Sequence, residues 1–123
     1  IGADNGAVLA DADLAQAQQC FVPFAATVTE VTVVADGGTP QVIVNRKIAG
    51  VTTALLSSAL ATAASGAIAC SRPGATTGYD ATTTCSATLQ NTTVAAGSFL
   101  GVTSGTAGGV AKRMSIAISY TVN

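Results

Sequence analysis

Residues that could carry out chemistry are few in this chain, because its 123 residues include no histidine. That composition excludes Ser-His-Asp and Cys-His nucleophile systems and the usual zinc sites. The sequence also contains no nucleophile elbow, phosphate loop or dinucleotide fingerprint. Two carboxylates could in principle hydrolyse a substrate as a pair. Asp36 lies beside Gly37-Gly38 and Asp80 lies in the loop between Cys70 and Cys85, however, and each is more simply a turn residue. We therefore predict a protein that is not an enzyme and uses no cofactor.

Oxygen ligands for a metal ion are also sparse. Asp11 and Asp13 share a face if the chain is extended there, and Asp4-Asn5-Gly6 is an oxygen-rich turn. Calcium takes about six to eight oxygen ligands, so either group would supply only part of a site. Turn and capping roles account for these residues more simply, and we predict no metal site.

The three cysteines predict one disulfide. Cys70 and Cys85 bracket a loop rich in glycine, threonine and serine. A bridge across a loop of this length would stabilise the fold by about 3 kcal/mol in the chain-entropy description. It indicates an oxidising setting, or a virion that acquires the bridge after assembly. Cys20 lies in an apolar strand pattern, and we expect it to be a small buried side chain.

Charged residues make up only 9% of the chain, against about 25% in an average soluble domain. With 25 Ala, 18 Thr and 13 Gly, hydroxyls and small apolar groups must cover most of the surface. Such a surface packs closely against copies of itself, although a monomer with a threonine-rich surface is the alternative. The net charge is −1, and the doublets Arg46-Lys47 and Lys112-Arg113 do not form a basic stripe, so we exclude nucleic acid as a partner.

A membrane-spanning role is rejected on similar grounds. Residues 48–71 carry no charge before Arg72 and are numerous enough for a helical span, but threonine, serine and glycine dilute their apolar side chains. Residues 81–111 are equally free of charge and have the composition of strands and turns. The N-terminal residues lack the basic and apolar regions of a signal peptide. Since the sequence begins with Ile1 and not with an initiator methionine, we expect a processed chain or a fragment of a longer one.

The dominant hydrophobic period is two, which is typical of strands. Residues 20–34 alternate apolar and polar side chains around Pro23, and residues 41–46 follow a turn at Asp36-Gly37-Gly38, so we predict a hairpin over 28–46. Residues 114–122 alternate to the C-terminus and form a second predicted hairpin with 99–103. Further short strands are expected at 48–56, 68–71 and 84–89, and one helical turn at 57–64.

This pattern predicts an all-β fold, an antiparallel β-sandwich of jelly-roll-like form with about seven or eight short strands and one short helical turn. We assign residues 19–123 to the sandwich domain. Residues 1–18 form an N-terminal strand or linker segment, which is a possible assembly strand.

Several motifs resemble the β-sandwich modules at the ends of bacteriophage tail fibres and of related virion proteins. The motifs are Ile1-Gly2-Ala3, the strand 21–29, Val33-Val34-Ala35-Asp36-Gly37-Gly38, the corner 94–100 and the last strand 114–118. Two features depart from that pattern: Ser98 stands where an acidic residue is usual, and the Cys70–Cys85 loop looks like an addition. The resemblance implies a fibre tip or spoke, often trimeric, that contacts host-surface glycans or proteins.

No binding residue carries over from this resemblance, because the contact loops of such modules vary. From loop position alone we expect contacts in the loop that holds Arg72, Tyr79 and Asp80, and in the turn 105–109.

Three functions stay open. The first is a structural or attachment module at a virion or extracellular surface. The second is a filament subunit that donates residues 6–19 to its neighbour as a strand. The third is a secreted carbohydrate-binding module, for which Tyr79 is the only aromatic residue in an expected loop.

Overall fold

The computed structural model describes residues 18–61, 68–74, 76–77, 84–106 and 113–123. Every regular element within these residues is a strand, and no helix there is long and apolar enough to span a bilayer. The strands are β1 (Gln18–Val22), β2 (Ala26–Ala35), β3 (Gln41–Ile48), β4 (Val51–Ala54), β5 (Leu60–Ala61), β6 (Ile68–Ser71), β7 (Thr76–Thr77), β8 (Thr84–Cys85), β9 (Thr93–Val94), β10 (Ser98–Thr106) and β11 (Met114–Val122).

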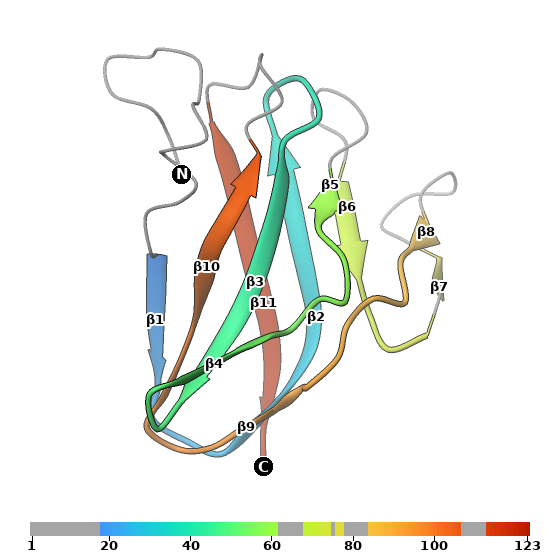
Figure 1. The fold of residues 1–123 in the computed structure, drawn as a ribbon. Helices are drawn as coiled ribbons and strands as arrows, with labels where there is room; N and C mark the ends of the chain where they lie inside the picture. Colours follow the sequence, from blue (N-terminus) through green and yellow to red (C-terminus); the bar gives the residue numbers. More distant parts are fainter. Residues whose placement is uncertain (1–17, 62–67, 75, 78–83, 107–112) are drawn as a thin grey trace.

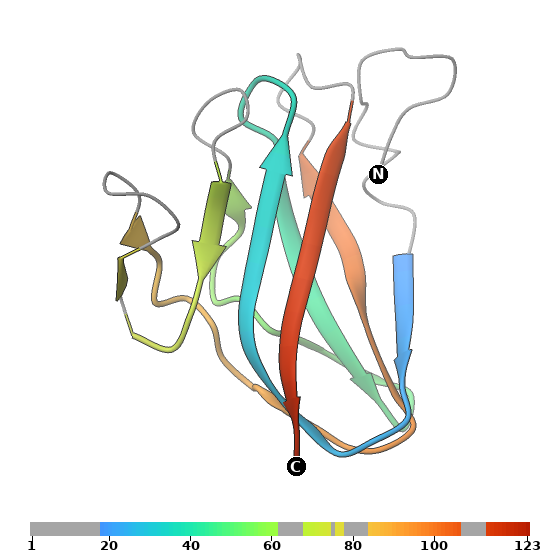
Figure 2. The ribbon, with the colours of Figure 1, turned by 180° about the vertical axis from the view of Figure 1, so that it is seen from behind.

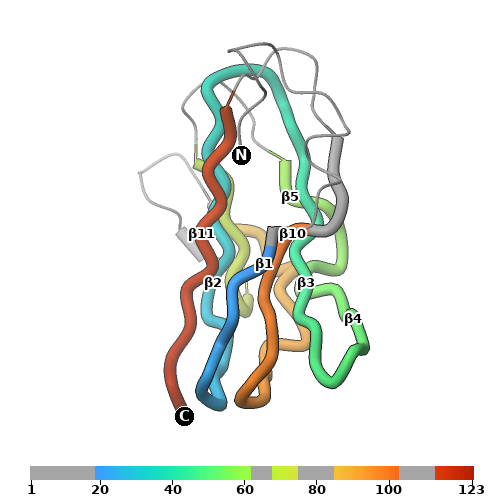
Figure 3. Tube along the Cα trace, turned by 90° about the vertical axis from the view of Figure 1, so that its left-hand side faces the viewer, coloured from blue at the N-terminus to red at the C-terminus, as the bar shows by residue number. Residues whose placement is uncertain are grey.

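Nine of these strands form two antiparallel sheets that face each other (Figures 1 and 2). The first sheet has the order β1-β10-β3-β4, with β5 also paired to β3; the second has the order β11-β2-β6, with β9 also paired to β2. Seen from the side of β1, the two layers separate clearly, with β11 in one and β1, β10 and β3 in the other (Figure 3). The predicted antiparallel β-sandwich is therefore confirmed, and β7 and β8 add a small two-stranded ribbon. The jelly-roll connectivity stays a prediction.

The long strand β2 changes the phase of its alternation at a β-bulge. Glu30 pairs with Ser119 and Val28 with Tyr120, so Thr29 is one extra residue on β2. A bulge of this kind shifts which side chains face inward, because the side-chain period of a strand is two. As a result Val28, Val31 and Val33 are all buried, and both halves of the strand turn valines toward the core.

The core between the sheets is built from valine, leucine, alanine and one methionine. Valine suits this position because a β-branched side chain packs well on a pleated surface. The described phenylalanines are not part of this core, since Phe21, Phe24 and Phe99 are all exposed. Burying such a side chain stabilises a fold by roughly 1.5–3 kcal/mol, so three exposed rings are a large apolar area left for contacts outside the domain.

One hairpin of the first sheet has clear turn geometry. Ile48 pairs with Val51 across a two-residue loop, in which Ala49 has φ 48° and Gly50 has φ 82°. Positive φ at both loop residues is the requirement of a type I′ turn, whose twist matches that of the flanking strands. The strand predicted within residues 48–56 is thus present as β4.

The two hairpins predicted from the sequence are wrong. β2 pairs with β11, β6 and β9, whereas β3 pairs with β10, β4 and β5, so residues 36–40 connect the two sheets rather than neighbouring strands. The same correction applies to β10 and β11, which lie in opposite sheets. Turn residues indicate that the chain reverses direction, but they do not determine whether the next strand pairs beside the last one or crosses to the facing sheet.

The predicted helical turn over 57–64 is also wrong where the structure describes it. Leu60 pairs with Val42, and Leu60–Ala61 is strand β5. The buried Leu60 side chain joins the core, and such packing overrides a weak local helix preference. Residues 62–64 lie outside the described residues, as does most of the predicted N-terminal segment 1–18. β1 begins at Gln18, the last residue of that segment.

Candidate functional site

A row of exposed side chains crosses the outer face of the first sheet. The strand register places Phe21 of β1 beside Phe99 of β10, Phe99 beside Lys47 of β3, and Lys47 beside Thr52 of β4. We call these four residues the outer row. The two rings have centroids 5.4 Å apart and an interplanar angle of 59°, a tilted pair that contributes about 0.5–1.5 kcal/mol beyond its buried area.

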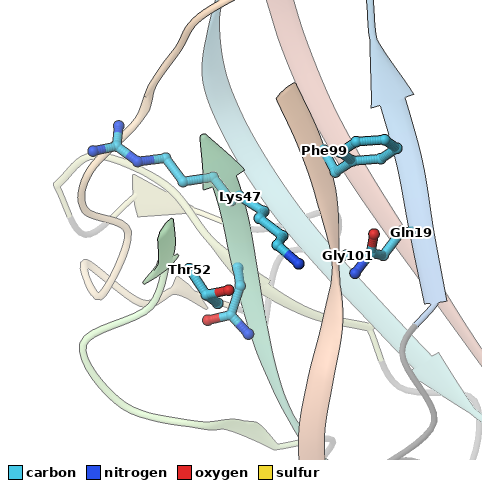
Figure 4. Close-up of a pocket in the computed structure, with 7 residues that line it drawn as sticks. Gln19, Lys47, Thr52, Phe99 and Gly101 are labelled. Atoms are coloured by element: carbon cyan, nitrogen blue, oxygen red, sulfur yellow. The ribbon is translucent and has the colours of Figure 1, made fainter. Parts of the chain in front are cut away.

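The next rung of the same sheet contains a shallow hollow. Gly101 pairs with Gln19 on one side and with Asn45 on the other, and it has no side chain to fill the space between them. Lys47 and Phe99 border this hollow, and Figure 4 shows Lys47 and Gln19 extending toward it from opposite sides. The sheet therefore offers an ammonium group and an amide next to an aromatic ring.

Only one residue of the basic doublet is available on this face. Arg46 donates hydrogen bonds from its Nη1 to the backbone carbonyls of Asn91 (2.6 Å) and Thr93, which ties β3 to the segment around β9. Lys47 is exposed. The cation that a ligand could reach in the outer row is therefore Lys47.

Exposed apolar side chains gather at one end of the sandwich. The large exposed hydrophobic residues among those described are Phe21, Phe24, Val51, Phe99, Tyr120 and Val122. They lie at the end of β1, in the link to β2, at the starts of β4 and β10, and at the end of β11, all at the end of the sandwich that also holds the C-terminus (Figure 1). We call this region the C-terminal apolar end.

The chemistry available at these surfaces is that of contact. The outer row and its hollow supply an amine, an amide, a hydroxyl and aromatic rings, with no carboxylate among the described residues that line them. Within the described part of the chain, no three His, Cys, Asp or Glu residues gather closely enough to hold a metal ion. Such a surface can bind a partner through apolar area and a few polar contacts.

The predicted disulfide is present in the structure. Cys70 of β6 and Cys85 of β8 are bonded, with their Cα atoms 4.7 Å apart, and both side chains are buried. Arg72, for which the contact role stays a prediction, forms an ion pair through its Nε with Glu30 of β2. Tyr79 and Asp80 lie outside the described residues, as does most of the turn 105–109.

A network of hydroxyl groups surrounds this disulfide. The Ser71 hydroxyl is 2.8 Å from the Thr88 hydroxyl, which is 3.0 Å from the Ser86 hydroxyl. The backbone N–H of Ser86 donates to the carbonyl of Cys70, and that of Arg72 donates to the carbonyl of Ser86. We call this region, with the Arg72–Glu30 pair, the bonded edge.

The prediction for Cys20 is wrong, because its thiol is free and exposed. Cys20 pairs with the buried Leu100, so it is on the inward face of β1 as the alternation predicts. It is accessible because no described strand covers the gap between β1 and β11, the edge strands of the facing sheets. Sequence reasoning missed this open edge and also the outer row, whose residues come together only through the strand register.

No known protein family, no curated protein and no solved structure matches this chain.

Proposed function

We propose that this chain is a non-enzymatic structural module of a virion or an extracellular appendage, which packs with copies of itself. The observation that carries the proposal is the C-terminal apolar end, where every described phenylalanine lies exposed. Phe21 is 58% exposed and Phe24 is 57% exposed, although the core consists of smaller side chains. Large exposed apolar patches on soluble proteins are typically interaction sites.

The low charge of the surface supports a repeated copy as the partner. Only 9% of the residues are charged, so two copies can approach without much like-charge repulsion or desolvation of ions. Threonine and alanine add little side-chain entropy cost when they are buried in an interface. The aromatic rings of the apolar end would supply the anchors that dominate the energy of such contacts.

Attachment to a host surface is the second part of the proposal. The hollow beside Gly101 places Lys47 and Gln19 next to Phe99, a combination of polar donors and an aromatic ring that suits a glycan or a protein loop. This contact uses the outer face of the first sheet. Phe99 belongs both to that face and to the apolar end, so the proposal requires packing between copies to leave part of this ring accessible.

The test is the oligomeric state in solution. We expect light scattering on a sizing column to detect a discrete oligomer or a polymer, with negative-stain microscopy of the same fractions to distinguish them. A variant with Phe21→Ser and Phe99→Ser should shift the distribution toward the monomer, because it removes the paired rings. Ala59→Ser, an exposed position away from the apolar end, serves as the control and should assemble like the natural chain. A wild-type chain that stays monomeric at every concentration would contradict the proposal.

A filament subunit is the second candidate, and one observation favours it. The two edge strands β1 and β11 border an open apolar groove, which is the kind of acceptor that strand exchange between subunits requires. Contacts that pass from one copy to the next in this head-to-tail way produce open polymers.

A further inference from the structure

The groove between β1 and β11 is continuous and apolar. Two adjoining hollows of about 220 and 250 Å³ share four lining residues, Cys20 and Leu100 on one sheet and Ile116 and Ile118 on the other. A water molecule occupies about 30 Å³ of liquid, so this space is far larger than a single hydration site. Ile116 and Ile118 pack against the core but are only half-buried, because the groove leaves one side of them open.

The strand beside this groove is an unprotected edge. Among the described residues, β11 pairs with β2 alone and forms the border of its sheet. Its nine residues contain no charged side chain and no proline, the two features by which edge strands commonly avoid pairing with another chain. The bulge at this border lies on β2, so β11 itself is regular. A further strand can therefore pair along β11 and cover the groove.

The N-terminal residues of the chain have the length and composition to supply that strand. Seventeen residues precede β1, and when extended they reach about 56 Å, whereas the nine residues of β11 span about 30 Å. Residues 6–10 read Gly-Ala-Val-Leu-Ala, with no charge and two large apolar side chains, Val8 and Leu9.

The sequence between those residues and β1 favours a neighbouring copy as the acceptor. To enter its own groove, the chain would have to reverse direction just before Gln18, which pairs with Val102 at one end of the groove. Tight reversals are usually made by Gly, Pro, Asn, Asp or Ser. Residues 11–17 contain no Gly, Pro, Asn or Ser, and their two residues of these types, Asp11 and Asp13, are followed by four residues of other types before β1, so this stretch favours a chain that continues away from its own domain.

We propose that residues 6–10 of a second copy add as a strand along β11 and place apolar side chains in the groove between β1 and β11. This inference rests on the proposed function, since it names the segment and the site by which copies pack. The pairing supplies backbone hydrogen bonds from the edge of β11. Val8 or Leu9, whichever faces inward, covers Ile116, Ile118 and Cys20.

Cys20 is a natural reporter of this contact, because its free thiol lines both hollows. The experiment follows alkylation of the full-length chain with iodoacetamide by intact-mass measurement. We expect Cys20 in assembled protein to react at least about tenfold more slowly than in a Val8→Asp, Leu9→Asp variant, which places carboxylates where apolar groups are needed. Ala15→Asp adds a charge outside residues 6–10 and should keep both the assembly and the protection.

A disulfide trap identifies the copy that donates the strand. Each donor chain carries Cys20→Ser together with one further substitution, which is Ala7→Cys, Val8→Cys, Leu9→Cys or Ala10→Cys. The acceptor chain keeps Cys20 and carries Val8→Asp and Leu9→Asp, so that it cannot donate its own strand. After mixing and mild oxidation, we expect a product of twice the chain mass on a non-reducing gel, with one copy of each kind. A third set of chains carries the same new cysteines but retains Cys20. If the new cysteine bridges to Cys20 within one chain at a dilution where the protein is monomeric, each chain fills its own groove and the inference is overturned.

The inference and the proposed function fail in different ways. If the protein assembles but Cys20 reacts equally fast in the natural chain and in the aspartate variant, the groove is not the contact, while packing between copies stands. If the natural chain never assembles, both proposals are contradicted.

Discussion

At the bonded edge of the sandwich, β6 is joined to β8 by the Cys70–Cys85 disulfide, and Glu30 on the neighbouring strand is paired with Arg72. At the opposite edge, β1 and β11 face each other across an apolar groove that exposes a free thiol. The bonded edge joins β6 of the second sheet to β8 of the small ribbon, whereas the open edge lies between the edge strands of the two main sheets. One edge is closed by covalent, ionic and hydroxyl contacts within the chain. The other keeps apolar surface for contacts with another chain.

Because the two edges differ in this way, we expect substitutions at them to change different properties of the protein. Changes at the bonded edge should lower the free energy of unfolding of the isolated domain, because they break interactions within one chain. Changes at the open edge should affect the isolated domain little and the assembled protein more, because they weaken interactions with another copy.

The largest effect is expected from removing the disulfide. A Cys70→Ser, Cys85→Ser variant should lose about 3 kcal/mol of unfolding free energy, since the bridge restricts the unfolded chain. Urea denaturation with and without reductant measures this loss. Cys20→Ser is the matched control at the open edge and should change the free energy by less than about 0.5 kcal/mol. Equal losses in the two variants would remove the distinction between the edges.

The ion pair of the bonded edge should give the next largest effect. Glu30 is 8% exposed and also accepts a hydrogen bond of 2.8 Å from the Thr32 hydroxyl. Arg72→Ala would leave that carboxylate without its cation and should cost about 1–3 kcal/mol. Arg113→Ala, at an exposed position, is the control and should be nearly neutral. Thermal unfolding at one fixed pH compares the two variants, and a neutral Arg72→Ala would show that the pair does not hold this edge.

The sequence predicts the strands of this fold better than their arrangement. The period-two alternation identifies β2, β10 and β11, because one face of each strand is apolar. It cannot show that β2 and β3 lie in different sheets, since the turn at Asp36-Gly37-Gly38 suits either outcome. The bulge at Thr29 is also hidden, because a valine-rich strand reads as apolar in both phases.

Only part of the candidate site can be predicted from the sequence. The disulfide is predictable, because Cys70 and Cys85 are close in sequence around a loop of turn residues. The outer row depends on the register between strands that are distant in the chain: Phe21 and Phe99 are neighbours only because β1 pairs with β10. The inward direction of Cys20 follows from alternation, but its exposure depends on which strands lie at the sheet edges.

A smaller effect is expected within the hydroxyl network. Ser71 is fully buried, and its hydroxyl lies 2.8 Å from that of Thr88. Ser71→Ala should cost about 1 kcal/mol, because it removes the hydrogen bonds of this hydroxyl to Thr88 and to the backbone carbonyl of Ser86 and leaves those groups with fewer partners. Ser57→Ala, at an exposed position, is the control and should be neutral in the same denaturation assay. A neutral Ser71→Ala would leave the disulfide and the ion pair as the only measurable contacts of the bonded edge.

The smallest effect on the isolated domain is expected at Ile118, on the wall of the groove. Ile118→Val removes one methylene from a half-buried side chain and should cost about 0.5 kcal/mol at a dilution where the protein is monomeric. At a concentration where copies assemble, the loss of unfolding free energy caused by Ile118→Val should be larger. The partner's strand would pack on the methylene that the substitution removes, and binding of that strand stabilises the folded domain. Thermal unfolding at the two concentrations measures the difference, with Val33→Ile in the closed core as a control whose effect should not depend on concentration. A cost at Ile118 that is the same at both concentrations would mean that the groove stays uncovered in the assembled protein, and the open edge would then have no part in the contact between copies.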